Sequence, residues 1–167
     1  YIQFAGTNVF RGDFDFSVIS DNVVAGSGSV AALDLQDTVS VRVDNNYFVT
    51  YARLGTVANS HITNNIFNSS VGSVHCIQMD GCSDNTITGN KIDSGTQVNI
   101  DGVRMGTNCD FNTIVGNVIS LQAGTPSYAV NIVDTTSARN VIVGNYLNGN
   151  TADINDGGTL TTVGNNG

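Results

Sequence analysis

Helix-forming and basic residues are scarce in this chain. It has no Glu, a single Lys and a single Pro among 167 residues, and all 14 of its acidic residues are Asp. Glu and Lys favour helices, whereas Asp, Asn, Gly, Ser and Thr favour turns. The apolar residues are mainly Val, Ile, Phe and Leu, which favour strands. We therefore expect an all-β fold.

Other absences exclude whole classes of function. The formal net charge of −8 leaves too few cations to neutralise a phosphate backbone, so we expect no nucleic-acid partner. No apolar run approaches the roughly 20 residues of a membrane span, so we expect no membrane partner. Three Cys are too few for a disulfide scaffold, and no Cys/His spacing suggests a zinc or other metal site.

A short motif recurs along almost the whole chain. It consists of an aliphatic residue, any residue, a Gly, Asn or Asp, then Asn, any residue and an apolar residue. The motif Asn residues are Asn22, Asn46, Asn65, Asn90, Asn117, Asn145 and, in a degenerate last copy, Asn165. Successive copies are about 24 residues apart, with intervals of 19 to 28. Such a period predicts a solenoid.

Each position of the motif has a physical interpretation. The residue before the Asn is always Asp, Asn or Gly. These types adopt a left-handed backbone conformation most readily, so a tight bend is predicted there. We expect each Asn to point inward at the bend and to bond to the equivalent Asn of the next rung, forming a ladder. The flanking apolar residues are predicted to form core columns.

An apolar-x-apolar triplet keeps step with the Asn motif. The triplets are Leu33–Leu35, Ala52–Leu54, Ile77–Met79, Val103–Met105, Val130–Ile132 and Ala152–Ile154. Such alternation marks a strand with one buried face. Two short strand types per turn predict a single-stranded right-handed parallel β-helix of about seven rungs, with roughly 24 residues per rung. It should form a single domain over residues 1–167.

The blocks "NTITGNKI" and "NTIVGNVI" resemble the repeats of the pectate-lyase-like parallel β-helix superfamily. That superfamily includes polysaccharide lyases, polygalacturonases, alginate epimerases and phage tailspikes. The resemblance covers roughly residues 15 to 165. It implies the fold and a polysaccharide partner and, in the tailspike branch, a homotrimer. Because the motif describes a scaffold, it does not specify an activity.

The middle residues of the triplets should form an outward polar stripe. In this superfamily such a face often holds an extended glycan, and guanidinium and amide groups match its hydroxyl and carboxylate groups. The stripe comprises Asp34, Arg53, Gln78, Arg104, Asn131 and Asp153, and the outward column before it comprises Ala32, Tyr51, Cys76, Gly102, Ala129 and Thr151. We expect carbohydrate binding by Tyr51, Arg53, Gln78, Arg104 and Asn131. Small residues at Gly102, Gly106 and Ala129 should leave room for a ligand. An ordinary solvated strand face is the simpler alternative.

Three residues near the stripe are candidates for catalysis. Glycosidases need two carboxyl groups about 5–9.5 Å apart, and Asp80 and Asp101 lie on neighbouring predicted rungs, near Arg104. A lyase would instead use an Arg or Lys base, for which Arg53 and Arg104 are candidates, with cations or calcium to neutralise charge. No cofactor is expected, with calcium left open. The paired-Asp, Gly-His-Gly and Arg-x-Lys motifs of polygalacturonases are absent, as is the Asp-Pro-His motif of alginate epimerases.

Two pairs of residues should meet between neighbouring rungs. His75 and Asp101 occupy equivalent positions and should form a charge-assisted hydrogen bond, with a structural or a catalytic role. Cys82 and Cys109 also occupy equivalent positions, as a disulfide or as two free thiols. Neither end shows a cap for an open solenoid, so we expect that the chain is part of a longer one or that neighbouring subunits cover its ends.

These observations favour a phage-tailspike-like β-helix that binds bacterial surface polysaccharide, with or without cleaving it, at an extracellular location or on the virion surface. One alternative is a secreted bacterial polysaccharide lyase, hydrolase or epimerase, which would release new reducing ends or unsaturated products. The other is a structural or adhesive solenoid without catalysis, which would bind no glycan.

Overall fold

Short alternations of buried and exposed residues produce the strands. In β11 (Ile77–Asp80), Ile77 and Met79 are buried while Gln78 and Asp80 are half-buried, because successive side chains of a strand point to opposite faces. The computed structural model describes residues 2–3, 10–12, 14–25, 30–69, 75–122, 127–148 and 152–167. Within these ranges every element is a strand, which confirms the expected all-β class.

The strands form three parallel sheets of seven strands each. Sheet 1 contains β2 (Phe10–Gly12), β5 (Leu33–Gln36), β8 (Ala52–Gly55), β11, β14 (Val103–Met105), β17 (Tyr128–Ile132) and β20 (Ala152–Asp156). Sheet 2 contains β3 (Val18–Ser20), β6 (Arg42–Asp44), β9 (His61–Thr63), β12 (Thr86–Thr88), β15 (Thr113–Val115), β18 (Val141–Val143) and β21 (Thr162–Gly164). Sheet 3 contains β1 (Ile2–Gln3), β4 (Val23–Ala25), β7 (Tyr47–Phe48), β10 (Ile66–Asn68), β13 (Lys91–Asp93), β16 (Val118–Ser120) and β19 (Tyr146–Asn148).

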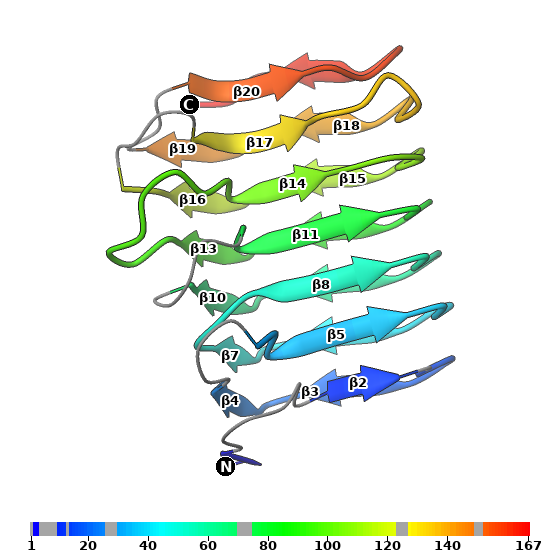
Figure 1. The fold of residues 1–167 in the computed structure, drawn as a ribbon, viewed down its shortest axis with the longest axis vertical. Coiled ribbons are helices and arrows are strands. Elements are labelled where there is room, and N and C mark those ends of the chain that lie inside the picture. Colours follow the sequence, from blue (N-terminus) through cyan, green and yellow to red (C-terminus); the bar gives the residue numbers. More distant parts are fainter. Residues whose placement is uncertain are drawn as a thin grey trace.

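The chain visits sheets 1, 2 and 3 in that order on each turn, so the turns stack along one axis (Figure 1). The strands of sheet 1 run from left to right in front, and the chain returns behind them as it climbs from the N-terminal to the C-terminal end. This path is a right-handed coil. The structure is therefore a right-handed parallel β-solenoid.

The expected seven rungs are slightly too many. About five turns of roughly 25 residues are complete. The turns from β5–β7 to β17–β19 each have three described strands and lie between two neighbouring turns, whereas β2 and β3 of the turn before them are edge strands. The last turn contributes only β20 and β21 to the described residues, and β1 pairs with β4 alone. The sequence-based count of seven included these partial turns, because a motif copy does not show whether all three strands of its turn are present.

Each complete turn has three strands, one more than the sequence predicts. The Asn motif does not form one strand, because the bend before the Asn divides it between sheets 2 and 3. The residue at that bend has a left-handed φ in six copies: Asp21 (59°), Asn45 (55°), Asn64 (55°), Gly89 (65°), Gly116 (64°) and Gly144 (65°). The predicted tight bend is thus confirmed in those copies.

The motif Asn side chains form the predicted ladder between sheets 2 and 3. Asn90 donates its backbone N–H and its Nδ2 to Asn117 Oδ1, at 2.9 and 3.0 Å. Asn117 makes the same two bonds to Asn145 Oδ1. Asn117 Nδ2 also donates to the carbonyl oxygen of Ile87 on the preceding turn, at 2.9 Å. The buried amides therefore satisfy backbone groups that the bend removes from the sheets.

The last copy of the motif is displaced by one residue from its predicted register. Asn166, and not Asn165, accepts two hydrogen bonds from Asn145, at 3.0 Å each. Asn165 is instead the bend residue, with a φ of 49°. Pairing of Ile142 with Val163 fixes this register, because the core side chain determines which residue reaches the bend. The segment "VGNN" offers two Asn, and local sequence alone does not distinguish them.

A second Asn ladder lies at the bend between sheets 1 and 2, where the sequence analysis predicts none. Asn85 donates its backbone N–H and Nδ2 to Asn112 Oδ1 at 3.2 and 3.0 Å, and Asn112 repeats the pattern with Asn140 at 2.9 and 3.1 Å. The preceding residues include Phe111 and Arg139, with φ of 57° and 56°. Because these residue types rarely adopt a left-handed conformation, only the recurring Asn signals this bend.

Apolar columns fill the interior of the stack. Phe48 and Phe67 of sheet 3 stack with ring centroids 5.0 Å apart, and Ile62, Ile87 and Ile114 of sheet 2 are fully buried. This core fixes the register of all three sheets. In the part of the chain that the structure describes, no helix has the length and hydrophobicity needed to cross a membrane.

Candidate functional site

The polar stripe on sheet 1 is in register over five turns. Strand pairing aligns five of the six predicted members on successive turns: Asp34, Arg53, Gln78, Arg104 and Asn131. The sheet therefore brings together residues that are 19 to 27 positions apart in the sequence. All four predicted carbohydrate-binding residues of the stripe itself lie in this column.

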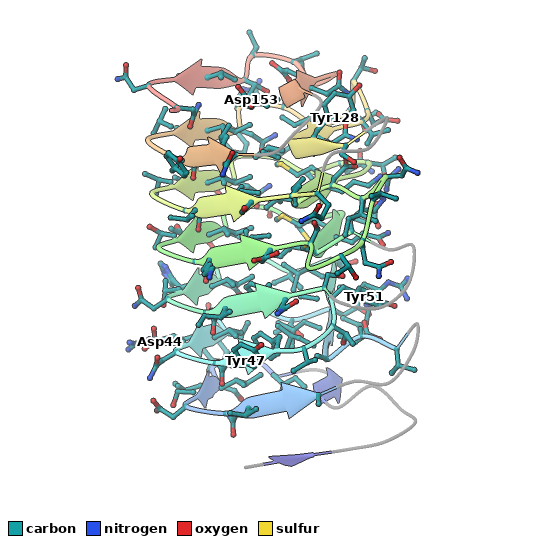
Figure 2. The ribbon with its side chains drawn as sticks, turned by 90° about the vertical axis from the view of Figure 1, so that its left-hand side faces the viewer. Asp44, Tyr47, Tyr51, Tyr128 and Asp153 are labelled. Carbon is teal, nitrogen blue, oxygen red and sulfur yellow. The ribbon has the colours of Figure 1, made fainter. Side chains whose placement is uncertain are left out.

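The sixth member of the stripe is Asn155, so the prediction of Asp153 is wrong. Asn155 pairs with Asn131 and donates its Nδ2 to Asn131 Oδ1 at 2.8 Å. The reason is that Ile154, and not Ala152, continues the core column of sheet 1. Figure 2 labels Asp153 at the C-terminal end of the stack.

The first member of the stripe is buried. Asp34 is 2% exposed and accepts a hydrogen bond from Gln36 Nε2 at 2.6 Å. An outward position on a strand does not ensure exposure, because side chains of neighbouring residues such as Gln36 can lie against it. The accessible part of the stripe therefore begins at Arg53.

Two arginines of the stripe carry positive charge that the described residues do not neutralise. Arg53 is exposed and Arg104 is half-buried, and neither guanidinium forms a hydrogen bond or ion pair with any described residue. Gln78 lies between them, so the two arginines are two strand spacings, or about 10 Å, apart. Gln78 donates its Nε2 to Asp80 Oδ2 at 3.0 Å.

The column before the stripe is not outward, contrary to expectation. Cys76 and Ala129 are fully buried, and Gly102 is buried as well. Cys76 and Gly102 belong to the bend that enters sheet 1, where side chains turn toward the core, and Ala129 lies within β17 but is buried as well. Of this column, Tyr51 is half-buried. In Figure 2 Tyr51 lies toward one edge of the stack and Asp44 toward the opposite edge.

The glycines around Arg104 do not leave open space for a ligand. A Cβ added to Gly102 would lie 2.5 Å from Ile119 Cγ2 and 2.6 Å from the carbonyl oxygen of Ala129. A Cβ added to Gly106 would collide with Asp80 Oδ1. Both glycines allow close packing, and the expected room is already filled by protein atoms.

The predicted contact between His75 and Asp101 is present. His75 Nδ1 lies 3.1 Å from Asp101 Oδ2 and accepts a hydrogen bond from the Asp101 backbone N–H at 3.0 Å. The carboxylate also accepts hydrogen bonds from the Tyr128 backbone N–H at 2.9 Å and from Asn131 Nδ2 at 2.8 Å. Burial by itself raises the pKa of Asp101, but the contact with His75 and the hydrogen bonds from Asn131 and Tyr128 outweigh it and lower the pKa. A carboxylate tied to three neighbours suits a structural role.

Asp80 and Asp101 enter the stripe region from opposite ends of the strand register. Asp80 follows Met79, which pairs with Met105, so Asp80 lies beside Gly106, at the opposite end of the strand from Asp101. Five residues at about 3.3 Å each separate the two backbone positions by at most about 16 Å along the strand, while the two carboxyl groups contact different stripe residues, Asp80 with Gln78 and Asp101 with Asn131. Arg104 lies between them on the outward face of β14.

The three cysteines are free and buried. Cys82 and Cys109 lie on adjacent turns as predicted, and a hydrogen bond between their thiols, together with burial, raises the pKa of Cys82. Burial raises the pKa of Cys76 to about 12. Among the described residues, no group of three or more His, Cys, Asp or Glu side chains is placed to hold a metal ion.

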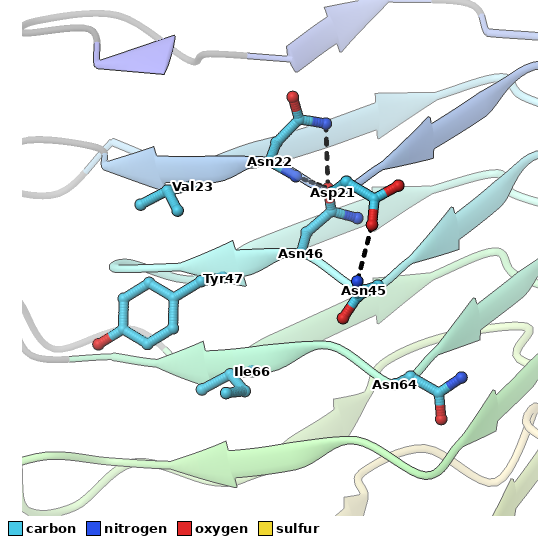
Figure 3. Close-up of a pocket in the computed structure, with 8 residues that line it drawn as sticks. All are labelled: Asp21, Asn22, Val23, Asn45, Asn46, Tyr47, Asn64 and Ile66. Carbon is cyan, nitrogen blue, oxygen red and sulfur yellow. Dashed lines mark hydrogen bonds between the residues drawn. The ribbon is translucent and has the colours of Figure 1, made fainter. Parts of the chain in front are cut away.

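A depression on another side of the molecule has no counterpart in the sequence predictions. It lies at the bend between sheets 2 and 3, has a volume of about 250 Å³, and is lined by Asp21, Asn22, Val23, Asn45, Asn46, Tyr47, Asn64 and Ile66 (Figure 3). The available signal was that the bend residue has a polar side chain in the first three motif copies and is Gly in the next three. The depression is distinct from the sheet 1 stripe.

Comparisons with known proteins leave the fold as the firm conclusion. No protein-family model, no curated protein and no solved structure matches this chain. The architecture is therefore established by the repeats and strand pairing of the chain itself, which form a parallel β-solenoid.

Proposed function

We propose that this protein is a phage-tailspike-like β-helix that binds bacterial surface polysaccharide along the sheet 1 stripe. The proposal includes a homotrimer and an extracellular or virion-surface location. The observation that carries it is the pair of guanidinium groups, Arg53 and Arg104, that have no partner among the described residues. A guanidinium held on a rigid strand offers several donors to hydroxyl or carboxylate oxygens.

The remaining stripe residues support binding to different degrees. Gln78 uses Nε2 to contact Asp80, which leaves its amide oxygen to accept from a sugar hydroxyl. Asn131 donates to Asp101 and accepts from Asn155, so its amide is largely occupied within the protein. Binding should therefore depend mainly on Arg53, Gln78 and Arg104, with Tyr51 beside them.

We assign no cleavage step to this site. A two-carboxylate mechanism needs both carboxyl groups at one scissile bond, and Asp80 and Asp101 lie at opposite ends of the strand. Asp101 also accepts hydrogen bonds from Tyr128 and Asn131 and contacts His75. A non-catalytic binding surface is the function that this geometry supports best.

A glycan array tests the proposal. The wild-type protein should bind one or more bacterial polysaccharides, and Arg53→Ala/Arg104→Ala should lose that binding. The control Arg42→Ala/Lys91→Ala also removes two positive charges from exposed positions, but on sheets 2 and 3, and should bind as the wild type does. Equal loss in both variants would indicate non-specific electrostatics and overturn the site assignment. Absence of binding by a folded wild type would favour the structural solenoid.

Two further measurements complete the test. Reducing-end and unsaturated-product assays on any bound glycan should be negative, whereas product release would restore the enzyme alternative. Multi-angle light scattering should give the molar mass of three chains, and a monomer would contradict the trimer.

A further inference from the structure

The bend between sheets 2 and 3 differs between the two halves of the molecule. Its left-handed residue is Asp21, Asn45 or Asn64 in the first three copies and Gly89, Gly116 or Gly144 in the next three. All six have φ between 55° and 65°, so the bend forms equally well without a side chain. The three polar side chains are therefore not required by the fold, and together they form a polar wall.

The polar wall faces an apolar column on sheet 3. Val23, Tyr47 and Ile66 are aligned by strand pairing, Val23 with Tyr47 and Tyr47 with Ile66. Val23 and Ile66 are each 39% exposed. Figure 3 shows the column and the wall side by side, with the depression between them.

The polar wall is held in place yet keeps free bonding capacity. Asn45 Nδ2 donates to Asp21 Oδ1 at 2.7 Å, and Asn64 Nδ2 donates to Asp44 Oδ1 at 3.2 Å. No donor among the described residues reaches Asn45 Oδ1, Asn64 Oδ1 or Asp21 Oδ2. Preorganised acceptors of this kind lower the entropic cost of binding a ligand.

Size and charge restrict the class of ligand. A volume of about 250 Å³ lies below the roughly 300–1,000 Å³ of pockets for drug-sized molecules, so a single small ring fits. Among the described residues, no Arg or Lys lines the depression, whereas the acidic Asp21 does, which disfavours anions. One wall is apolar and the other accepts hydrogen bonds, so the ligand needs an apolar face and an edge of hydroxyl groups.

We propose that this depression binds one neutral pyranose residue. The C–H face of the sugar lies against Tyr47 and Ile66, and its hydroxyls donate to Asp21, Asn45 and Asn64. The site uses no residue of the sheet 1 stripe and does not rest on the function proposed for that stripe. It adds a second carbohydrate contact on a different face of the solenoid.

Titration with methyl glycosides, followed by two-dimensional ¹⁵N NMR, tests the proposal on the folded protein. The methyl glycosides of glucose, galactose and mannose are the neutral probes, and that of glucuronic acid is the acidic comparison. At least one neutral glycoside should cause saturable shifts at the side-chain amides of Asn45 and Asn64, with a millimolar dissociation constant, and the acidic glycoside should bind more weakly. Shifts confined to the sheet 1 stripe, or no saturable shifts, would overturn the proposal.

Matched variants separate the two walls from general effects on the fold. Asn45→Gly copies the natural Gly116 and Gly144 bends, so it should fold normally and bind about tenfold more weakly. Tyr47→Ala should weaken binding similarly, whereas Tyr146→Ala, which changes the same residue type in the same column, should have no effect. Unchanged binding by Asn45→Gly would overturn the proposal. Arg53→Ala/Arg104→Ala should keep these shifts, which distinguishes this site from the stripe.

A gain of binding gives a second test. Gly116→Asn/Gly144→Asn would build the polar wall beside Val118 and Tyr146, which pair on sheet 3. Nothing lies within 4 Å of a Cβ at Gly144, and only Thr88 Oγ1, at 3.9 Å, lies near one at Gly116. The folded variant should show new glycoside-dependent shifts at Tyr146. Their absence would overturn the assignment of binding to the paired walls.

Discussion

Asn117→Ala should be strongly destabilising because Asn117 lies within the first Asn ladder, with ladder members on both sides. Its side chain is 1% exposed. Its Oδ1 accepts the backbone N–H and the Nδ2 of Asn90, and its Nδ2 donates to Ile87 O, Val115 O and Asn145 Oδ1. Alanine removes all of these bonds without disturbing the apolar columns.

The expected magnitude follows from the groups that lose their partners. Asn90 Nδ2 keeps its bonds to Ile62 O and Thr88 O, and Asn145 Oδ1 keeps the Asn117 backbone N–H. The Asn90 backbone N–H is buried and loses its acceptor. Leaving one such group unsatisfied costs about 1–3 kcal/mol, so the free energy of unfolding should fall by about that amount.

Equilibrium urea unfolding, followed by circular dichroism, measures this change from the transition midpoint at constant slope. The matched control is Asn166→Ala, which removes the same side chain from the end of the same ladder. Asn166 is half-buried, so water can replace its amide and the loss of stability should be smaller. Equal losses for the two variants, or a loss within error for Asn117→Ala, would refute the ladder as a source of stability.

Three further outcomes are expected. In urea unfolding, Gly116→Val should lower the free energy of unfolding by about 1–2 kcal/mol more than Gly116→Asn. A β-branched residue resists a φ of 64°, whereas no nearby atom obstructs either side chain. Equal losses for the two variants would contradict the left-handed bend. The pKa of Asp101 is lowered from 3.8 by its hydrogen bonds, so its contribution to stability is complete above that pH and is lost as the pH falls through the lower folded-state pKa. In urea midpoints measured below pH 4, Asp101→Asn should therefore show a shallower pH dependence than the wild type, and an identical slope would exclude this linkage. Cys76, with a pKa of about 12, should react with a thiol reagent at pH 8 only after unfolding, so labelling of Cys76 in the folded protein would show that it is accessible.

The bends were predictable from the residue types that adopt a left-handed conformation, and the sheet 1 strands were predictable from the alternation of apolar residues. Asp21, Asn45 and Gly116 belong to the few residue types that suit a left-handed bend. A recurring Asn after them can form hydrogen bonds with the equivalent Asn of the next turn. The exposure of individual residues was less predictable. Cys76 and Gly102 precede a strand, where the chain is bending, so alternation along the strand does not specify the direction of their side chains.

The sequence by itself determined the parallel coil, its period and the first Asn ladder, because each depends on residue types repeated at a regular interval. Only the tertiary structure decided which polar residues remain available to a ligand. Asp101 is occupied by His75, Asn131 and the Tyr128 backbone, whereas Arg104 is not, and the depression beside Tyr47 has walls from three different turns. Contacts between turns depend on register, and register is fixed by the packing of the whole core.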